Sequence, residues 1–123
     1  MKILFVTSEC APYSKSGGLA DVAFSLPPAL KQTGDEIAVI TPLYRCVKHR
    51  FGDQLTMVKE ITVQLGWRKI YCGLWKGEQQ GVPIFFIDNL EYFDRDRLYG
   101  YGDDDLRFFG LCVVYRYGIG QMV

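Results

Sequence analysis

Residues 2–41 decide the fold, and they read KILFVTSECAPYSKSGGLADVAFSLPPALKQTGDEIAVIT. The run from Lys2 to Thr7 is apolar and rich in branched and aromatic side chains, which predicts a strand buried on both faces. Glu36–Thr41 has the same character and predicts a second buried strand. Between them, Leu19–Thr33 has the periodicity of a helix. A strand, a helix and a strand in this order predict a βαβ unit with two neighbouring parallel strands and a right-handed crossover.

The helix is predicted from apolar residues that share one face of an α-helix. They are Leu19, Val22, Ala23, Leu26 and Leu30. Gly34 stands where a glycine commonly ends a helix. Pro27 and Pro28 each lack an N–H group and crowd the preceding turn, so we expect a kink or a break near residues 24–25.

The rest of the chain adds a different pattern to this unit. Apolar and polar residues partly alternate over 58–65 and the run 70–75 follows, which predicts an antiparallel hairpin. Val82–Ile87 predicts a further buried strand, residues 90–105 a long loop, and residues 106–122 a helix weakened by glycines. The expected fold class is therefore α/β, Rossmann-like, with a mainly parallel sheet and an inserted antiparallel hairpin.

Composition narrows the range of possible functions. The 123 residues fit one domain, and 14 basic against 14 acidic residues give no net charge, which argues against nucleic-acid and membrane-surface partners. No apolar run has the length of a membrane span, and the apolar run at the start is too short for a signal peptide. The four cysteines are widely spaced and His49 is the single histidine, so we expect no metal site, no disulfide framework, and free thiols in a reducing cytoplasm.

The segment Ser14–Val22 is the candidate functional site. It follows the first strand and opens the first helix, and in open α/β sheets ligands bind at that edge. Gly17 and Gly18 would let the backbone approach a phosphate, Lys15 would supply a positive charge, and Asp21 could face a sugar hydroxyl. The standard phosphate-binding glycine motifs do not occur here. The residues alone therefore leave two alternatives open: an anion site, or a plain helix start with a solvated lysine and a surface carboxylate.

Residues 15–22, KSGGLADV, resemble the K-[ST]-G-G-L-[AG]-D-V signature of bacterial glycogen synthases and plant starch synthases. Further similar blocks follow in the family's order. They are MKILFVTSE at 1–9, LPPAL at 26–30, VITPLY at 39–44, VPIFFIDN at 82–89, YFDR at 92–95 and LYG at 98–100. The resemblance extends over residues 1 to about 109.

This resemblance implies a GT-B arrangement, in which two Rossmann-like halves face each other across a cleft. It implies transfer of glucose from ADP-glucose to the 4-hydroxyl of an α-1,4-glucan, with retention and without a metal or other cofactor. Lys15, Gly17 and Gly18 would bind the donor's diphosphate. Asp21 and Tyr99 would line the sugar or acceptor side, with Tyr101 as the neighbouring alternative to Tyr99.

The sequence departs from the family in one important respect. The resembled enzymes continue with a catalytic histidine in a His-Asp-Trp context and a second domain, and neither occurs in residues 1–123. We therefore expect residues 1–123 to be an amino-terminal domain truncated at its carboxyl end, with no catalytic residue of its own, inactive without the missing domain. The alternative is a non-catalytic nucleotide- or carbohydrate-binding module.

Overall fold

The computed structural model describes residues 1–65, 67–89, 93 and 98–100 of the chain. Its elements, in chain order, are β1 (Lys2–Val6), α1 (Gly18–Gln32), β2 (Glu36–Pro42), α2 (Arg45–Phe51), the 3-10 helix η1 (Gly52–Gln54), β3 (Thr56–Leu65), β4 (Arg68–Gln79) and β5 (Val82–Asp88). No helix in these ranges is long and apolar enough to cross a membrane.

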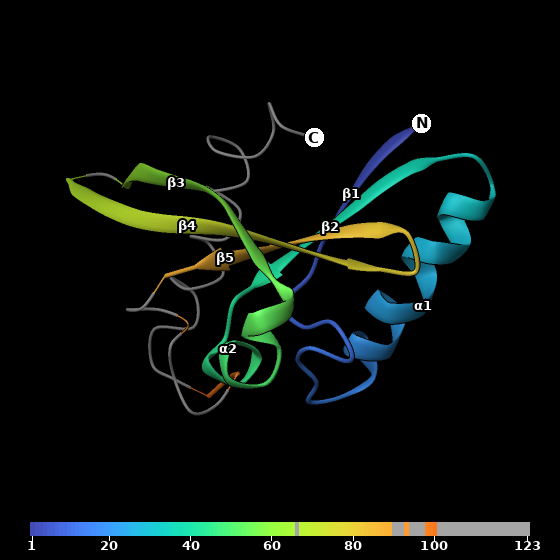
Figure 1. Ribbon diagram of the computed structural model, residues 1–123, viewed down its shortest axis with the longest axis horizontal. Helices are drawn as coiled ribbons and strands as arrows, with labels where there is room; N and C mark the ends of the chain where they lie inside the picture. The colour runs from blue at the N-terminus through green and yellow to red at the C-terminus, as the bar shows by residue number, and fades with distance from the viewer. Residues whose placement is uncertain (66, 90–92, 94–97, 101–123) are drawn as a thin grey trace.

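The five strands form one mixed sheet in the order β1-β2-β5-β4-β3 (Figure 1). β1 pairs with β2 in parallel, with Leu4 opposite Ala38, and β2 pairs in parallel with β5. β4 then pairs antiparallel with both β5 and β3. The predicted parallel pair, the inserted hairpin and the further buried strand are all confirmed. β5 is the strand at which the parallel part of the sheet meets the hairpin.

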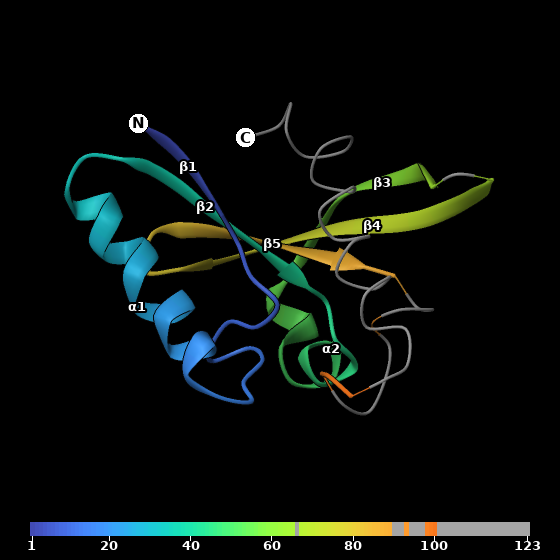
Figure 2. The same cartoon turned by 180° about the vertical axis from the view of Figure 1, so that it is seen from behind.

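Both helices cover the same face of the sheet, as alternate residues of β5 show. Ile84 lines a small cavity together with Ala23 of α1, and the ring centroid of Phe86 lies 5.0 Å from that of Tyr13 in the loop after β1. Asp88 forms an ion pair of 2.8 Å with Lys48 of α2. Figures 1 and 2 show α1 and α2 on one side of the sheet. The loop after β1 is therefore held between the two helices and against the sheet.

The inner face of α1 differs from the predicted apolar stripe. Its buried residues are Ala20, Ala23 and Pro27. Of the predicted stripe, Ala23 is buried and Leu30 packs partly buried against the core, whereas Leu19 (46%), Val22 (47%) and Leu26 (40%) are exposed. Small side chains let the helix lie close to the loop after β1, and this close packing sets the rotation of the helix rather than the bulk of its leucines.

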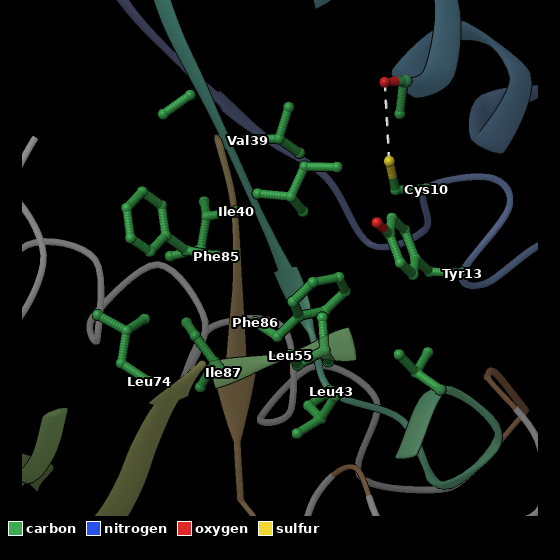
Figure 3. Packing of buried hydrophobic residues seen from close by; sticks show 14 of the residues in the cluster. Cys10, Tyr13, Val39, Ile40, Leu43, Leu55, Leu74, Phe85, Phe86 and Ile87 are labelled. Carbon is green, nitrogen blue, oxygen red and sulfur yellow. Dashed lines mark hydrogen bonds between the residues drawn. The ribbon is translucent and has the colours of Figure 1, made fainter. Parts of the chain in front are cut away.

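Of the kink or break predicted near residues 24–25, the break is wrong, because α1 is continuous over Gly18–Gln32. Pro27 cannot donate the helical hydrogen bond to the carbonyl of Ala23. The Cys10 thiol lies 3.7 Å from that oxygen and 3.6 Å from its alternative acceptor, the carbonyl of Ala11 (Figure 3). A donor from the loop thus reaches the carbonyl that the proline leaves without its usual partner. Gly34, with φ of 96°, follows the helix as predicted.

β1 is less buried than its sequence predicts. Its three central residues are half-buried, and Val6 is 41% exposed. The sequence predicted burial on both faces, but within the described residues β1 lies at the edge of the sheet and has a neighbour on one side only. The central strands β2 and β5 supply most of the fully buried residues instead.

The helix α2 was missed at the sequence level, because seven residues are too few to establish a helical period. Val47 is its one fully buried residue. The predicted loop over 90–105 falls mostly, and the predicted helix over 106–122 wholly, outside the described residues.

Candidate anion-binding site at the start of helix α1

The loop between β1 and α1 is folded by its own hydrogen bonds. The Thr7 hydroxyl donates to the backbone carbonyl of Glu9 at 2.7 Å. Cys10 and Ser14 are joined twice, because the Ser14 N–H donates to the Cys10 carbonyl at 2.8 Å and the Cys10 N–H donates to Ser14 Oγ at 3.1 Å. This closed turn delivers residues 15–17 to the amino end of α1.

Glu9 is the centre of the site, and sequence reasoning missed it. The residue is 2% exposed, and its carboxylate accepts four hydrogen bonds. The donors are Ser16 Oγ at 2.6 Å, the Gly17 N–H at 3.2 Å, the Ala20 N–H at 3.1 Å and the Tyr99 hydroxyl at 2.9 Å. Glu9 therefore serves as the side-chain cap of α1 from outside the helix.

A signal for this role was present in the sequence. The residue that precedes α1 is Gly17, which has no side chain and so cannot cap the helix itself. The first N–H groups of a helix need an acceptor, and Glu9 is the nearest acid before the helix in the sequence. What the sequence could not give is the fold of residues 10–16, which brings the carboxylate back to the helix.

Two opposing effects act on the pKa of Glu9. Burial raises the pKa, because it disfavours the charged form. The hydrogen bonds from Ser16, Tyr99 and the two backbone amides lower it, and together they outweigh burial, so that the pKa lies below its usual value. Glu9 is thus a carboxylate at neutral pH.

The amide of Gly17 is therefore already occupied, whereas those of Gly18 and Leu19 have no partner within the described residues. A Cβ atom placed on Gly17 or Gly18 would meet nothing within 4 Å. The backbone at the start of α1 is thus open to an approaching group. The positive end of the helix dipole favours an anion at this place. Of the two predicted glycines, Gly18 offers a free donor and Gly17 anchors the loop.

Lys15 and Asp21 lie beside this opening and contact each other. The Lys15 ammonium lies 2.8 Å and 2.9 Å from the two carboxylate oxygens of Asp21. Both side chains are more than half exposed, so solvent screens the pair and either partner can exchange for another at low cost. An anion bound at Gly18 would compete with Asp21 for Lys15.

Tyr99 reaches the same loop from the far end of the described chain. Its hydroxyl lies 2.6 Å from Ser8 Oγ and donates to Glu9. Since the ionised Glu9 can only accept, the hydrogen of Ser8 Oγ points to Tyr99. Tyr44 donates to the Ser8 carbonyl at 2.6 Å, so two tyrosines hold this segment. The alternative residue, Tyr101, lies outside the described residues.

The described residues hold no cluster of three or more potential metal ligands. His49, on α2, is exposed and lies outside the glycine loop. The site thus consists of two free amides, one cation with a replaceable partner, and a buried carboxylate behind them.

An open α/β sheet with a glycine loop after its first strand is typical of domains that bind ligands at the carboxyl ends of their strands. The family model of the starch synthase catalytic domain matches residues 2–116. The chain belongs to this family.

Individual proteins similar to this chain are glycogen and starch synthases as well. The chain is 53% identical over 108 residues to a glycogen synthase of Bacillus cereus (strain Q1), which covers 88% of this chain and 23% of the relative. It is 45% identical over 112 residues to a glycogen synthase of Anoxybacillus flavithermus, with 91% and 23% covered. The catalytic domain of starch synthase IV from Arabidopsis thaliana, solved with ADP and acarbose, matches with a TM-score of 0.85 and 27% identity over 97% of this chain and 25% of that one. The chain thus spans about a quarter of the length of these relatives.

Proposed function

We propose that residues 1–123 are part of the amino-terminal domain of an ADP-glucose-dependent glucosyltransferase. The enzyme would transfer glucose to the 4-hydroxyl of an α-1,4-glucan with retention, in the cytoplasm. The observation that carries this proposal is the pair of free amides at Gly18 and Leu19 beside Lys15, in a family whose named members are glycogen and starch synthases. The ADP and acarbose bound by the Arabidopsis starch synthase support a nucleotide and a glucan as ligands.

In this proposal, the donor's diphosphate lies against the Gly18 and Leu19 amides. Lys15 leaves Asp21 and pairs with the phosphate oxygens, which stabilises the ADP leaving group as the glycosidic bond breaks. Asp21, once released, is free to bind a sugar hydroxyl. Tyr99 lies on the sugar or acceptor side of the loop. No residue of this chain is assigned the chemical step.

Calorimetric titration of the chain with ADP, ADP-glucose and a maltooligosaccharide tests the proposal. Lys15→Ala is compared with Lys59→Ala, an exposed lysine of β3 far along the sheet. A charge-assisted hydrogen bond contributes about 1.5–3 kcal/mol, and loss of the Asp21 pair offsets part of it, so we expect Lys15→Ala to weaken ADP binding about tenfold. Lys59→Ala should bind as the unaltered chain does. The absence of ADP binding, or equal effects of both variants, would contradict the proposal. Binding of the maltooligosaccharide alone would favour a carbohydrate-binding module.

A further inference from the structure

Glu9 is the most completely buried ionisable carboxylate in the described part of the chain, and the proposed function gives it no role. It does not face the opening of the loop, because its two oxygens accept from Ser16, Gly17, Ala20 and Tyr99. A buried carboxylate this close to a proposed diphosphate site repels the ligand's charge. Its presence therefore needs an explanation beyond charge.

The backbone geometry of Gly17 supplies one. This residue is extended, with φ of −165° and ψ of −155°. In extended backbone, consecutive N–H groups point to opposite sides. Since the Gly17 N–H donates inward to Glu9, the Gly18 N–H points outward.

The bond from the Ala20 N–H to the same oxygen fixes the first turn of α1 relative to Gly17. The Glu9 carboxylate thus binds the amides of Gly17 and Ala20, which stand directly before and after the amides of Gly18 and Leu19. The Ser16 hydroxyl, on the other oxygen, holds the residue that follows Lys15.

Resting on the proposed function, we propose that Glu9 is a positioning residue that holds Gly17 and Ala20 inward, so that the Gly18 and Leu19 amides face the donor's diphosphate. Tyr99 shares this task, because its hydroxyl donates to Glu9 and contacts Ser8, which joins a segment 90 residues away to the loop. A misplacement of about 1 Å can cost an enzyme about a hundredfold in rate, so such an anchor has a large effect.

Two substitutions at Glu9 distinguish its role in positioning the loop amides from the effect of its negative charge. Glu9→Gln keeps a side-chain oxygen for the Gly17 and Ala20 amides and removes the negative charge. Glu9→Ala removes both. We expect Glu9→Gln to bind ADP within about threefold of the unaltered chain, and Glu9→Ala to bind about ten- to a hundredfold more weakly, because misplaced amides lose hydrogen bonds to a charged ligand. A helix cap that merely competed with the ligand would give the opposite result, because Glu9→Ala would free two more amides and tighten ADP binding.

A second readout needs no ligand. Hydrogen exchange of the Gly17 and Ala20 amides, followed by NMR, should be slow in the unaltered chain and in Glu9→Gln, and fast in Glu9→Ala. Tyr99→Phe keeps the ring and removes the hydrogen bonds of the hydroxyl to Glu9 and Ser8, so it should speed exchange at Gly17 and have little further effect there when combined with Glu9→Ala. This variant tests the anchor even where Glu9→Ala fails to fold.

The outcomes are distinguishable. An unaltered chain that fails to bind ADP contradicts the proposed function, while the exchange measurement still decides whether Glu9 holds the two amides. Equal ADP affinity in Glu9→Ala and the unaltered chain, or tighter binding in Glu9→Ala, overturns the inference. Unchanged exchange at Gly17 and Ala20 in Glu9→Ala overturns it as well.

Discussion

The two adjacent glycines of the loop have different tasks. The Gly17 amide is bound to Glu9, whereas Gly18 begins α1 with a free amide and open space above it. The sequence located the loop of Lys15, Gly17 and Gly18, but it did not distinguish Gly17, whose amide is bound to Glu9, from Gly18. Glu9 was not predictable, since its role depends on how residues 10–16 fold back, and its partners lie up to 90 residues away.

Substituting Gly18 separates binding from stability. A Cβ atom added at this position meets nothing within 4 Å in the ligand-free chain, so we expect the free energy of unfolding of Gly18→Val to stay within about 0.5 kcal/mol of the original. Its branched side chain would occupy the space above the free amides, and we expect ADP binding to be lost. Urea denaturation and calorimetry measure the two effects. A variant that binds ADP normally would show that no ligand approaches this backbone.

The slow reaction expected of the buried thiols provides a test of the fold. Burial raises the pKa of Cys10 and that of Cys72 to about 11. At pH 8 only about one thiol in a thousand is then ionised, and the thiolate is the reactive form. In a chain with Cys46 and Cys112 replaced by serine, we expect a thiol reagent to react slowly with the native protein and promptly in denaturant. Prompt reaction with the native protein would contradict the burial of both thiols.

Among the elements, the parallel pair of β1 and β2 and the hairpin were predictable, but the rotation of α1 was not. Hydrophobic periodicity favoured the face that carries Leu19, Val22 and Leu26, yet the helix turns its alanines inward. The hydrogen bond from the Ala20 N–H to the Glu9 carboxylate fixes how α1 is rotated relative to the loop before it. Hydrophobic periodicity in the sequence does not reveal such a bond. The thiol of Cys10 likewise lies near the Ala23 carbonyl, which Pro27 leaves without its helical donor.

An ion pair joins α2 to the sheet in addition to the burial of Val47. Lys48 and Asp88 are 2.8 Å apart, with side-chain exposures of 27% and 14%. Lys48→Met keeps the apolar stem and leaves the Asp88 carboxylate unpaired, so we expect unfolding to require about 2 kcal/mol less. The matched control is Lys2→Met, whose partner Glu36 is 3.9 Å away and mostly exposed, with an effect under about 0.5 kcal/mol. Equal losses in urea denaturation would show that the Lys48 pair contributes nothing of its own.

For the whole molecule, we expect the 123-residue chain to synthesise no glucan. Holding the donor, its leaving phosphate and the acceptor hydroxyl together can supply about 7–11 kcal/mol of a barrier. The chain spans 23% of its Bacillus relatives, and its site offers binding groups from one loop and one tyrosine. Incubation with ADP-glucose and a maltooligosaccharide, with released ADP as the readout, measures this. Glucosyl transfer by the purified chain would mean that its own residues, or a second copy, complete the reaction site.

The most direct test is an NMR titration of the chain with ADP, following the backbone amides of residues 16–21. We expect the largest saturable shifts at Gly18 and Leu19, with Gly17 and Ala20 shifting little because both remain bonded to Glu9. Lys15→Ala should reduce the affinity and leave the pattern of shifts unchanged. Largest shifts at residues far from this loop, or no saturable shift at Gly18 and Leu19, would contradict an anion site at the start of α1.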